Sequence, residues 1–146
     1  MFKHILLATD GSAACDQATR IAIALARTHG ARLMAVNVVD PYPYLGIGES
    51  NPLGFQSYMS AAYEHASQVH AKITLLCSQA TPPVTLQTRM AEEVTAASGI
   101  VETAKDENSD LIVMGSHGRT GLARLMLGSV VTKVLAESSV PVLVVR

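Results

Sequence analysis

Apolar runs and helical periods alternate along the whole chain. Runs of apolar residues predict five strands, at residues 3–9, 31–39, 84–90, 111–114 and 140–145. The runs at 3–9 and 111–114 are continuously apolar, which is typical of strands that are covered on both faces. In 84–90 apolar and polar residues alternate, and this pattern indicates a half-exposed strand at an edge of the sheet.

Between these runs, apolar residues recur at helical spacing and predict four helices. The first follows Ser12, a predicted N-cap, and ends at Gly30. The second covers about 56–80, the third ends near Asn108, and the fourth begins after Gly128.

The resulting order βαβαβαβαβ predicts one α/β domain over residues 1–146. It is expected to be a doubly wound, five-stranded parallel sheet with helices on both faces. A segment rich in proline and glycine, 40–55, separates the second strand from the second helix. Connections longer than about 12–15 residues tend to be lids, binding loops or disordered segments.

Charge and composition exclude several classes of function. The formal net charge is −1, and no strongly basic run of the kind that binds nucleic acid is present. No stretch approaches the ~20 apolar residues of a membrane span, and no cleavage site for a signal peptide precedes the first strand. Cys15 and Cys77 have no metal or redox spacing, so we expect two buried thiols in a reducing compartment. We therefore expect a cytoplasmic protein that binds no nucleic acid and does not insert into a membrane.

Two strand ends carry unusual turns. In doubly wound sheets, ligands bind at the carboxyl ends of the strands, where the strand order reverses. The first strand leads into Thr9-Asp10-Gly11-Ser12, and the fourth leads into a glycine-rich turn at 115–121. If the sheet reverses between these two strands, both turns face one crevice.

The glycine-rich turn has the features of a phosphate site. Its glycines would let backbone N–H groups approach an anion closely, and Gly128-Ser129 precedes the last helix, whose first turn has free N–H groups. Residues 111–136 contain no acidic side chain but several basic ones. Tight packing between a strand and a helix would select the same glycines, so the pattern by itself leaves both interpretations open. It matches neither the P-loop nor the dinucleotide fingerprint.

Three segments and one spacing carry a resemblance to a known family. They are Ile5-Leu6-Leu7-Ala8-Thr9-Asp10-Gly11-Ser12, Asp110-Leu111-Ile112-Val113-Met114-Gly115-Ser116-His117-Gly118-Arg119, Pro141-Val142-Leu143-Val144-Val145, and Gly115-x-x-Gly118 followed after nine residues by Gly128-Ser129. Together they resemble the ATP-binding branch of the universal stress protein family. One departure is Met90-Ala91-Glu92-Glu93-Val94, where many members have a Gly-x-Pro turn. The resemblance implies a Rossmann-like, adenine nucleotide alpha hydrolase-like sheet with strand order 3-2-1-4-5.

The resemblance also implies an adenine-nucleotide site. In the family the phosphates lie on the second glycine turn and the following helix start, while the ends of the first and second strands border the adenosine. The positions that match here are Ala8, Thr9, Asp10, Val38, Met114, Gly115, His117, Gly118, Arg119, Gly128, Ser129 and Val130. The implied ligand is ATP, or ADP or AMP in its place, with or without Mg²⁺.

Asp10 and His117 each allow a second interpretation. Asp10 could bind ribose or Mg²⁺, or it could cap the helix near Ser12, and the resemblance favours the ribose. His117 could be a general base, but a histidine in a phosphate turn more simply donates a hydrogen bond. Ser129 has no Gly-x-Ser-x-Gly elbow, so we do not interpret these residues as a catalytic triad.

Three functional hypotheses follow. The leading one is an ATP-binding universal stress protein that acts as a nucleotide-responsive regulatory or stress-protection protein. The alternative is a slow ATPase or another enzyme that transfers phosphate or adenylyl groups, although paired carboxylates for two metals are not evident. The third is a structural dimeric module without a nucleotide.

The last strand, 140–145, is apolar and expected at an edge of the sheet, where it could pair with a second chain. Dimers of the family use this strand, and we predict a homodimer.

Overall fold

Five parallel strands form the centre of the molecule. The computed structural model describes residues 1–39, 52–92, 94–117 and 126–146. The strands lie in the order β3-β2-β1-β4-β5, and each neighbouring pair is parallel. They are β1 (His4–Ala8), β2 (Arg32–Val38), β3 (Leu86–Ala91), β4 (Leu111–Gly115) and β5 (Val142–Val145). The predicted doubly wound sheet of order 3-2-1-4-5 is confirmed.

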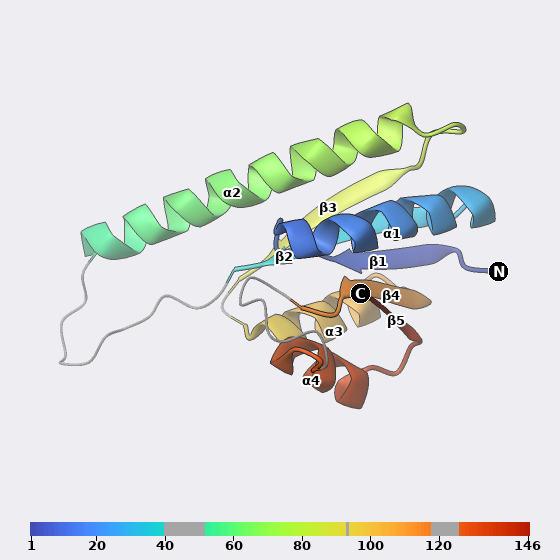
Figure 1. The fold of residues 1–146 in the computed structure, drawn as a ribbon. Coiled ribbons are helices and arrows are strands. Elements are labelled where there is room, and N and C mark those ends of the chain that lie inside the picture. The colour runs from blue at the N-terminus through green and yellow to red at the C-terminus, as the bar shows by residue number, and fades with distance from the viewer. Residues whose placement is uncertain (40–51, 93, 118–125) are drawn as a thin grey trace.

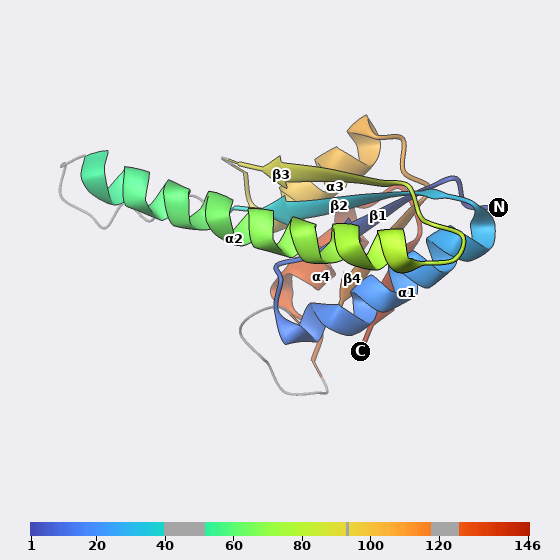
Figure 2. The ribbon, with the colours of Figure 1, turned by 90° about the horizontal axis from the view of Figure 1, so that it is seen from above.

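Helices cover both faces of this sheet. Figure 1 shows α1 (Asp16–His29) and α2 (Pro52–Gln79) on one side, and α3 (Ala96–Asp106) and α4 (Ser129–Glu137) on the other. Seen from above in Figure 2, α2 runs along the β2–β3 side of the sheet and extends beyond it at its N-terminal end. A short 3-10 helix, η1 (Ala13–Cys15), precedes α1.

The two faces of β1 bury alternate residues in two separate cores. Ile5 and Leu7 belong to the core beneath α1 and α2, while Leu6 and Ala8 belong to the core beneath α3 and α4. All four side chains are buried, because helices remove both faces of the strand from water. This explains why the first strand is apolar without alternation. The alternating strand, β3, lies at one edge as predicted.

The predicted cap at Ser12 is confirmed in position only. Ser12 is the N-cap residue of η1, which leads into α1 at Asp16, but its side chain makes no capping hydrogen bond. The Ser12 hydroxyl instead donates to the thiol sulfur of Cys15 at 3.6 Å. The backbone N–H of Cys15, from which a capping side chain would accept a hydrogen bond, donates instead to the carbonyl oxygen of Ser12 at 3.0 Å. The backbone N–H of Ser12 donates to Asp10 and fixes the turn before η1.

Other element boundaries differ by a few residues from the predicted ones. Helix α2 starts at Pro52 rather than 56, since a proline is tolerated at the first helical position, where its missing N–H has no intrahelical partner. Of the predicted loop 40–55, residues 40–51 lie outside the described part of the chain. Helix α1 ends at Gly30 as predicted, and Gly30 has a positive φ of 64°.

The turn before α3 differs from the Gly-x-Pro turn of many family members. Here Thr95 caps α3, because its side chain accepts a hydrogen bond from the N–H of Ser98.

In the part of the chain that the structure describes, no helix is both long and apolar enough to cross a bilayer.

Candidate functional site

A cavity of about 640 Å³ opens at the carboxyl ends of the strands. It lies at the point where the strand order reverses, because the chain proceeds from β1 to β2 and β3 in one direction and to β4 and β5 in the other. Ala8 of β1 is paired with Met114 of β4, so the turns that follow these two strands lie side by side. This is the place where open α/β sheets bind ligands.

The structure brings the sequence-predicted site residues together around this cavity. Those within the described ranges all line it: Ala8, Thr9, Asp10, Val38, Met114, Gly115, His117, Gly128, Ser129 and Val130. Gly118 and Arg119 lie outside the described residues. Residues from four separate segments of the sequence therefore share one cavity.

The turn after β1 is held by short hydrogen bonds. The backbone N–H of Gly11 donates to the Thr9 hydroxyl at 3.1 Å, and that of Ser12 donates to Oδ1 of Asp10 at 2.8 Å. The thiol of Cys15 also donates to Oδ1 of Asp10, at 3.2 Å. The carboxylate of Asp10 therefore shapes the turn while it lines the cavity.

Burial governs the thiol of Cys15. The side chain is 6% exposed and lines the cavity beside Asp10. Removal from water disfavours the thiolate and raises the pKa of Cys15 above its ordinary value. At neutral pH this residue is a thiol that donates a hydrogen bond. Cys15 and Cys77 are both free and buried, as expected from their spacing.

The turn after β4 is packed closely against its neighbours. Ser116 donates its backbone N–H to the carbonyl oxygen of Val145 at 2.7 Å, and Gly128 donates to the carbonyl oxygen of Ser116 at 3.0 Å. A Cβ at Gly115 would lie 3.2 Å from the carbonyl oxygen of Ala14, and one at Gly128 would lie 3.3 Å from that of Ser116. These two glycines therefore serve tight packing, which was one of the two interpretations of the glycine pattern, and both also line the cavity.

Helix α4 points its N-terminus at the cavity. Gly128 is the N-cap, and Ser129 and Val130, in the first turn, line the cavity. The first turn contains no acidic residue. The free N–H groups of a first turn carry a partial positive charge, so this end of the cavity favours an anion.

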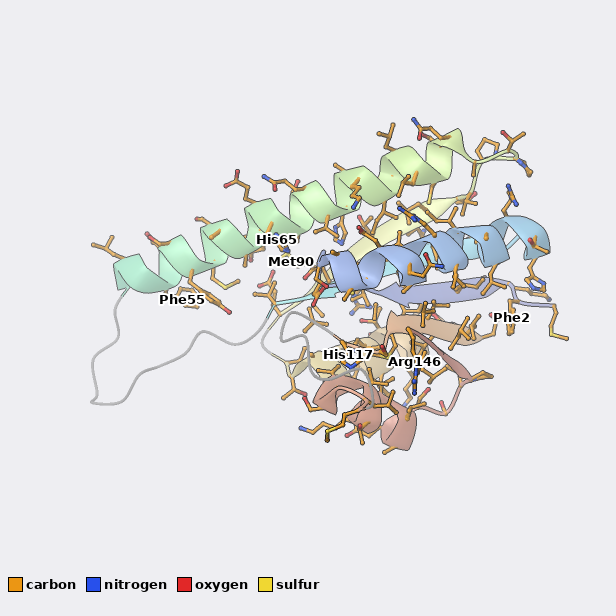
Figure 3. All side chains as sticks on the ribbon, viewed as in Figure 1. Phe2, Phe55, His65, Met90, His117 and Arg146 are labelled. Atoms are coloured by element: carbon orange, nitrogen blue, oxygen red, sulfur yellow. The ribbon has the colours of Figure 1, made fainter. Side chains whose placement is uncertain are left out.

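One wall of the cavity consists of residues that no sequence motif indicated. This wall comes from α2 and from β2, and it includes Asn37, Tyr58, Ala61, Ala62 and His65. Nε2 of His65 lies 2.8 Å from the backbone carbonyl oxygen of Asp10. Figure 3 shows His65 on the side of α2 that faces the sheet, and His117 between the sheet and α4. One signal was available: Asn37 is the single polar residue between Leu33 and Val39.

Two polar groups at the cavity have no hydrogen-bond partner in the described structure. They are Nδ2 of Asn37 and Nε2 of His117, and both atoms are buried. The other ring nitrogen of His117, Nδ1, lies 2.8 Å from the Ser116 hydroxyl. A buried polar atom without a partner costs about 1–3 kcal/mol, so a ligand that pairs with these atoms would bind favourably.

Comparison with known proteins identifies the family. The model of the universal stress protein family matches residues 1–146. A universal stress protein of Thermus aquaticus is 40% identical over the full length of both chains. One from Methanocaldococcus jannaschii is 34% identical over all of this chain and 83% of its own.

Solved structures agree with the sequence relatives. The universal stress protein UspA of Lactobacillus plantarum superposes with a TM-score of 0.87 at 27% identity, over 99% of this chain and 97% of its own. The same fold occurs in a universal stress protein in complex with cAMP, at TM-score 0.62 and 22% identity over 99% of this chain and 97% of its own. It also occurs in one from Archaeoglobus fulgidus in complex with dAMP, at 0.61 and 18%, over 99% and 98%. From its sequence match over all 146 residues and from its fold, the chain belongs to the universal stress protein family.

Proposed function

We propose that the protein binds ATP in the cavity at the reversal of strand order and acts as a nucleotide-responsive regulatory or stress-protection protein in the cytoplasm. The observation that carries the proposal is the cavity itself. It joins an anion-favouring helix N-terminus, close-packed glycines and two buried polar atoms without partners. We take ADP and AMP as ligands of the same site.

The phosphates lie at the α4 end of the cavity in this proposal. The backbone N–H groups of Ser129 and Val130 have no acceptor within the helix, and Gly115 and Gly128 have no side chain. When the Ser116 hydroxyl donates to Nδ1 of His117, the proton of that ring sits on Nε2, which then donates to a phosphate oxygen. In this tautomer His117 acts as a hydrogen-bond donor rather than as a base.

The adenosine occupies the other end, against the ends of β1 and β2. Ala8, Thr9 and Asp10 border the ribose, and the backbone at Val38 borders the base. All four line the cavity. Two universal stress proteins of this fold form complexes with cAMP and dAMP, which are both adenine nucleotides. These complexes support an adenine nucleotide as the ligand class.

The site favours binding over fast catalysis. Within the described ranges, Asp10 is the one carboxylate that lines the cavity. A Mg²⁺ ion bound with the nucleotide would be held by phosphate oxygens and water, and Asp10 would reach it only in place of its contact with the ribose. Two-metal hydrolysis needs more carboxylates than this. ATP thus acts as a ligand whose binding changes conformation or assembly.

Thermal unfolding with and without nucleotide tests the proposal. A ligand at 100 times its Kd adds about 2.7 kcal/mol to the folded state. For a domain of this size, Tm should rise by several degrees, at about 2–4 °C per kcal/mol. The variant Gly128→Val should lose the shift, because its side chain enters the space beside Ser116 and His117. Gly30→Ala, at a turn with open space, is the matched control and should keep the shift in Tm.

Two results would contradict the proposal. One is the absence of any shift in Tm with ATP, ADP or AMP. The other is ATP hydrolysis by the purified protein at well above a few turnovers per hour that is lost in His117→Ala, which would support the ATPase instead.

We also propose a homodimer that pairs through the last strand. In the described structure β5 is an edge strand with β4 as its neighbour, and Leu143 on it is 38% exposed. Leu135 of α4, Met126 and Leu127 are exposed large apolar residues close to it in sequence. An apolar edge strand with free backbone groups is a template for pairing with another chain.

A further inference from the structure

The side-chain amide of Asn37 is buried, polar and without a partner on Nδ2. Asn37 is 4% exposed, although it lines the cavity, and no protein group in the described structure accepts a hydrogen bond from Nδ2. Its neighbours on β2, Val36 and Val38, are apolar. A buried amide without a partner lowers the stability of the folded protein, unless a group bound in the cavity accepts a hydrogen bond from its N–H.

The position of Asn37 matches the base end of a bound nucleotide. Asn37 lies in β2, and His117 lies two residues after the end of β4. Strand β1 lies between β2 and β4 in the sheet. Neighbouring strands are about 4.8 Å apart, so the two residues are separated by roughly 10 Å across the sheet. A nucleoside phosphate spans a gap of this size between its base and its phosphate. Asn37 and His117 therefore stand on opposite sides of β1, far enough apart to contact two different parts of one ligand.

The chemistry of an amide distinguishes adenine from guanine. The amino group N6 of adenine is a donor, and it lies next to an acceptor ring nitrogen on both sides, N7 on one edge and N1 on the other. An asparagine amide, with one donor and one acceptor, complements either pair. Guanine offers two acceptors, O6 and N7, on the corresponding edge, so the amide oxygen would have no donor there. On the Watson–Crick edge guanine has an acceptor, O6, and a donor, N1–H, in the reverse order of adenine. An amide held in the orientation that fits adenine therefore meets like groups in guanine.

We infer that Asn37 is the specificity-determining residue of the nucleotide site and selects adenine over guanine. Its N–H group donates to a ring nitrogen of the base, and its amide oxygen accepts from the amino group. The inference rests on the proposed nucleotide-binding function and adds the residue that chooses the base. Asp10, which is hydrogen-bonded within its own turn, remains at the ribose.

The test compares the affinities of ATP and GTP by titration calorimetry. The wild-type protein should prefer ATP by about 5–150-fold, the usual value of one bidentate contact. Asn37→Asp replaces the donor by an acceptor at nearly equal shape, and Asn37→Leu removes hydrogen bonding without adding charge. Both should bring the ratio of the two Kd values to within about threefold of unity, or below it in Asn37→Asp. Asn108→Asp makes the same change at an exposed turn far from the cavity lining and should keep the wild-type ratio.

A second measurement needs no variant and so does not depend on folding of the mutants. Purine riboside triphosphate lacks the 6-amino group and should bind the wild-type protein at least about fivefold more weakly than ATP. If ATP binds but the Asn37 variants keep the wild-type ratio, or the riboside binds as tightly as ATP, the inference is wrong and the proposed function stands. If the wild-type protein binds neither ATP nor GTP at millimolar concentration, the proposed function itself is overturned.

Discussion

Nε2 of His65 lies 2.8 Å from the backbone carbonyl oxygen of Asp10, and this contact joins α2 to the turn that follows β1. A carbonyl oxygen only accepts, so Nε2 carries the proton and donates. The two residues are 55 positions apart in the sequence. Because Asp10 lines the cavity, this hydrogen bond links α2 to the site.

His65→Phe should destabilise the protein. The ring keeps its bulk but loses its donor, so the partly buried carbonyl of Asp10 loses this hydrogen bond, at a cost of about 1–3 kcal/mol. Urea unfolding would measure the change. Glu64→Ala, at the exposed neighbouring position, should stay within about 0.5 kcal/mol of wild type. Equal stability of His65→Phe and wild type would show that the contact contributes nothing.

Gly11→Ala should cost more stability than Gly30→Ala. Both glycines have positive φ, 78° and 64°, which costs a residue with a Cβ about 1–2 kcal/mol. A Cβ at Gly11 would in addition overlap the side chain of Val69 on α2, whereas one at Gly30 meets open space. The overlap should add at least about 1 kcal/mol. Thermal unfolding of the two variants gives the comparison, and an equal loss in both would mean that α2 moves aside freely.

Acidification should destabilise the protein through His70. Burial lowers the pKa of His70 below its ordinary 6.5, and its Nε2 has no partner in the described structure. His70 therefore takes up a proton near pH 6.5 in the unfolded chain, whereas in the folded chain it stays neutral to a lower pH. Its contribution to the free energy of unfolding is complete above pH 6.5 and is lost as the pH falls toward the lower pKa of the folded state. The free energy of unfolding should fall less between pH 7 and pH 5 in His70→Gln than in wild type. Parallel pH profiles of the two proteins would contradict this.

Both thiols should react slowly in the folded protein. Burial raises the pKa of Cys77 to about 11 from 9.0, so its thiolate fraction at pH 8 is about a hundredfold below that of the unfolded chain. The pKa of Cys15 is raised as well, chiefly by burial. Labelling with a chromogenic disulfide should be slow in buffer and release two equivalents rapidly in guanidinium. A fast first equivalent in buffer that disappears in Cys15→Ala would show that the cavity admits the reagent and activates that thiol.

A charge on β5 should separate the proposed dimer. Leu143→Lys places an ammonium group on the exposed side of the edge strand, which disfavours pairing. Light scattering after size exclusion should give a dimer for wild type and a monomer for this variant. Leu75→Lys, at a 57% exposed position on α2, should remain a dimer. A wild-type monomer would contradict the proposed assembly.

The strands and their places in the sheet could be predicted from the sequence, because the number of faces of a strand that are shielded from water sets its pattern of apolar residues. Ile5 to Ala8 are apolar without a break since helices cover both faces of β1, and the alternation in 84–90 reflects the edge position of β3. The order of elements then leaves few parallel topologies, and the resemblance selected the right one. The turns after β1 and β4 were expected at one crevice for the same reason, and their residues line one cavity.

Local pattern was incomplete at the start of the first helix. Ser12 has the residue type of a cap and stands at the N-cap of η1, but its hydroxyl contacts the sulfur of Cys15, and the N–H of Cys15 donates to the Ser12 carbonyl oxygen. Which acceptor an N–H takes is decided by geometry over a few residues, and propensity does not record it.

The sequence by itself determined the strands, the layers and the glycine-lined end of the cavity, because each depends on a few consecutive residues and on general rules of connection. Only the tertiary structure decided the opposite wall. His65 reaches Asp10, and Tyr58, Ala61 and Ala62 join it at the cavity, because α2 runs along the β2–β3 side of the sheet and extends beyond it. That placement depends on contacts between residues tens of positions apart, and no periodicity in either segment encodes it.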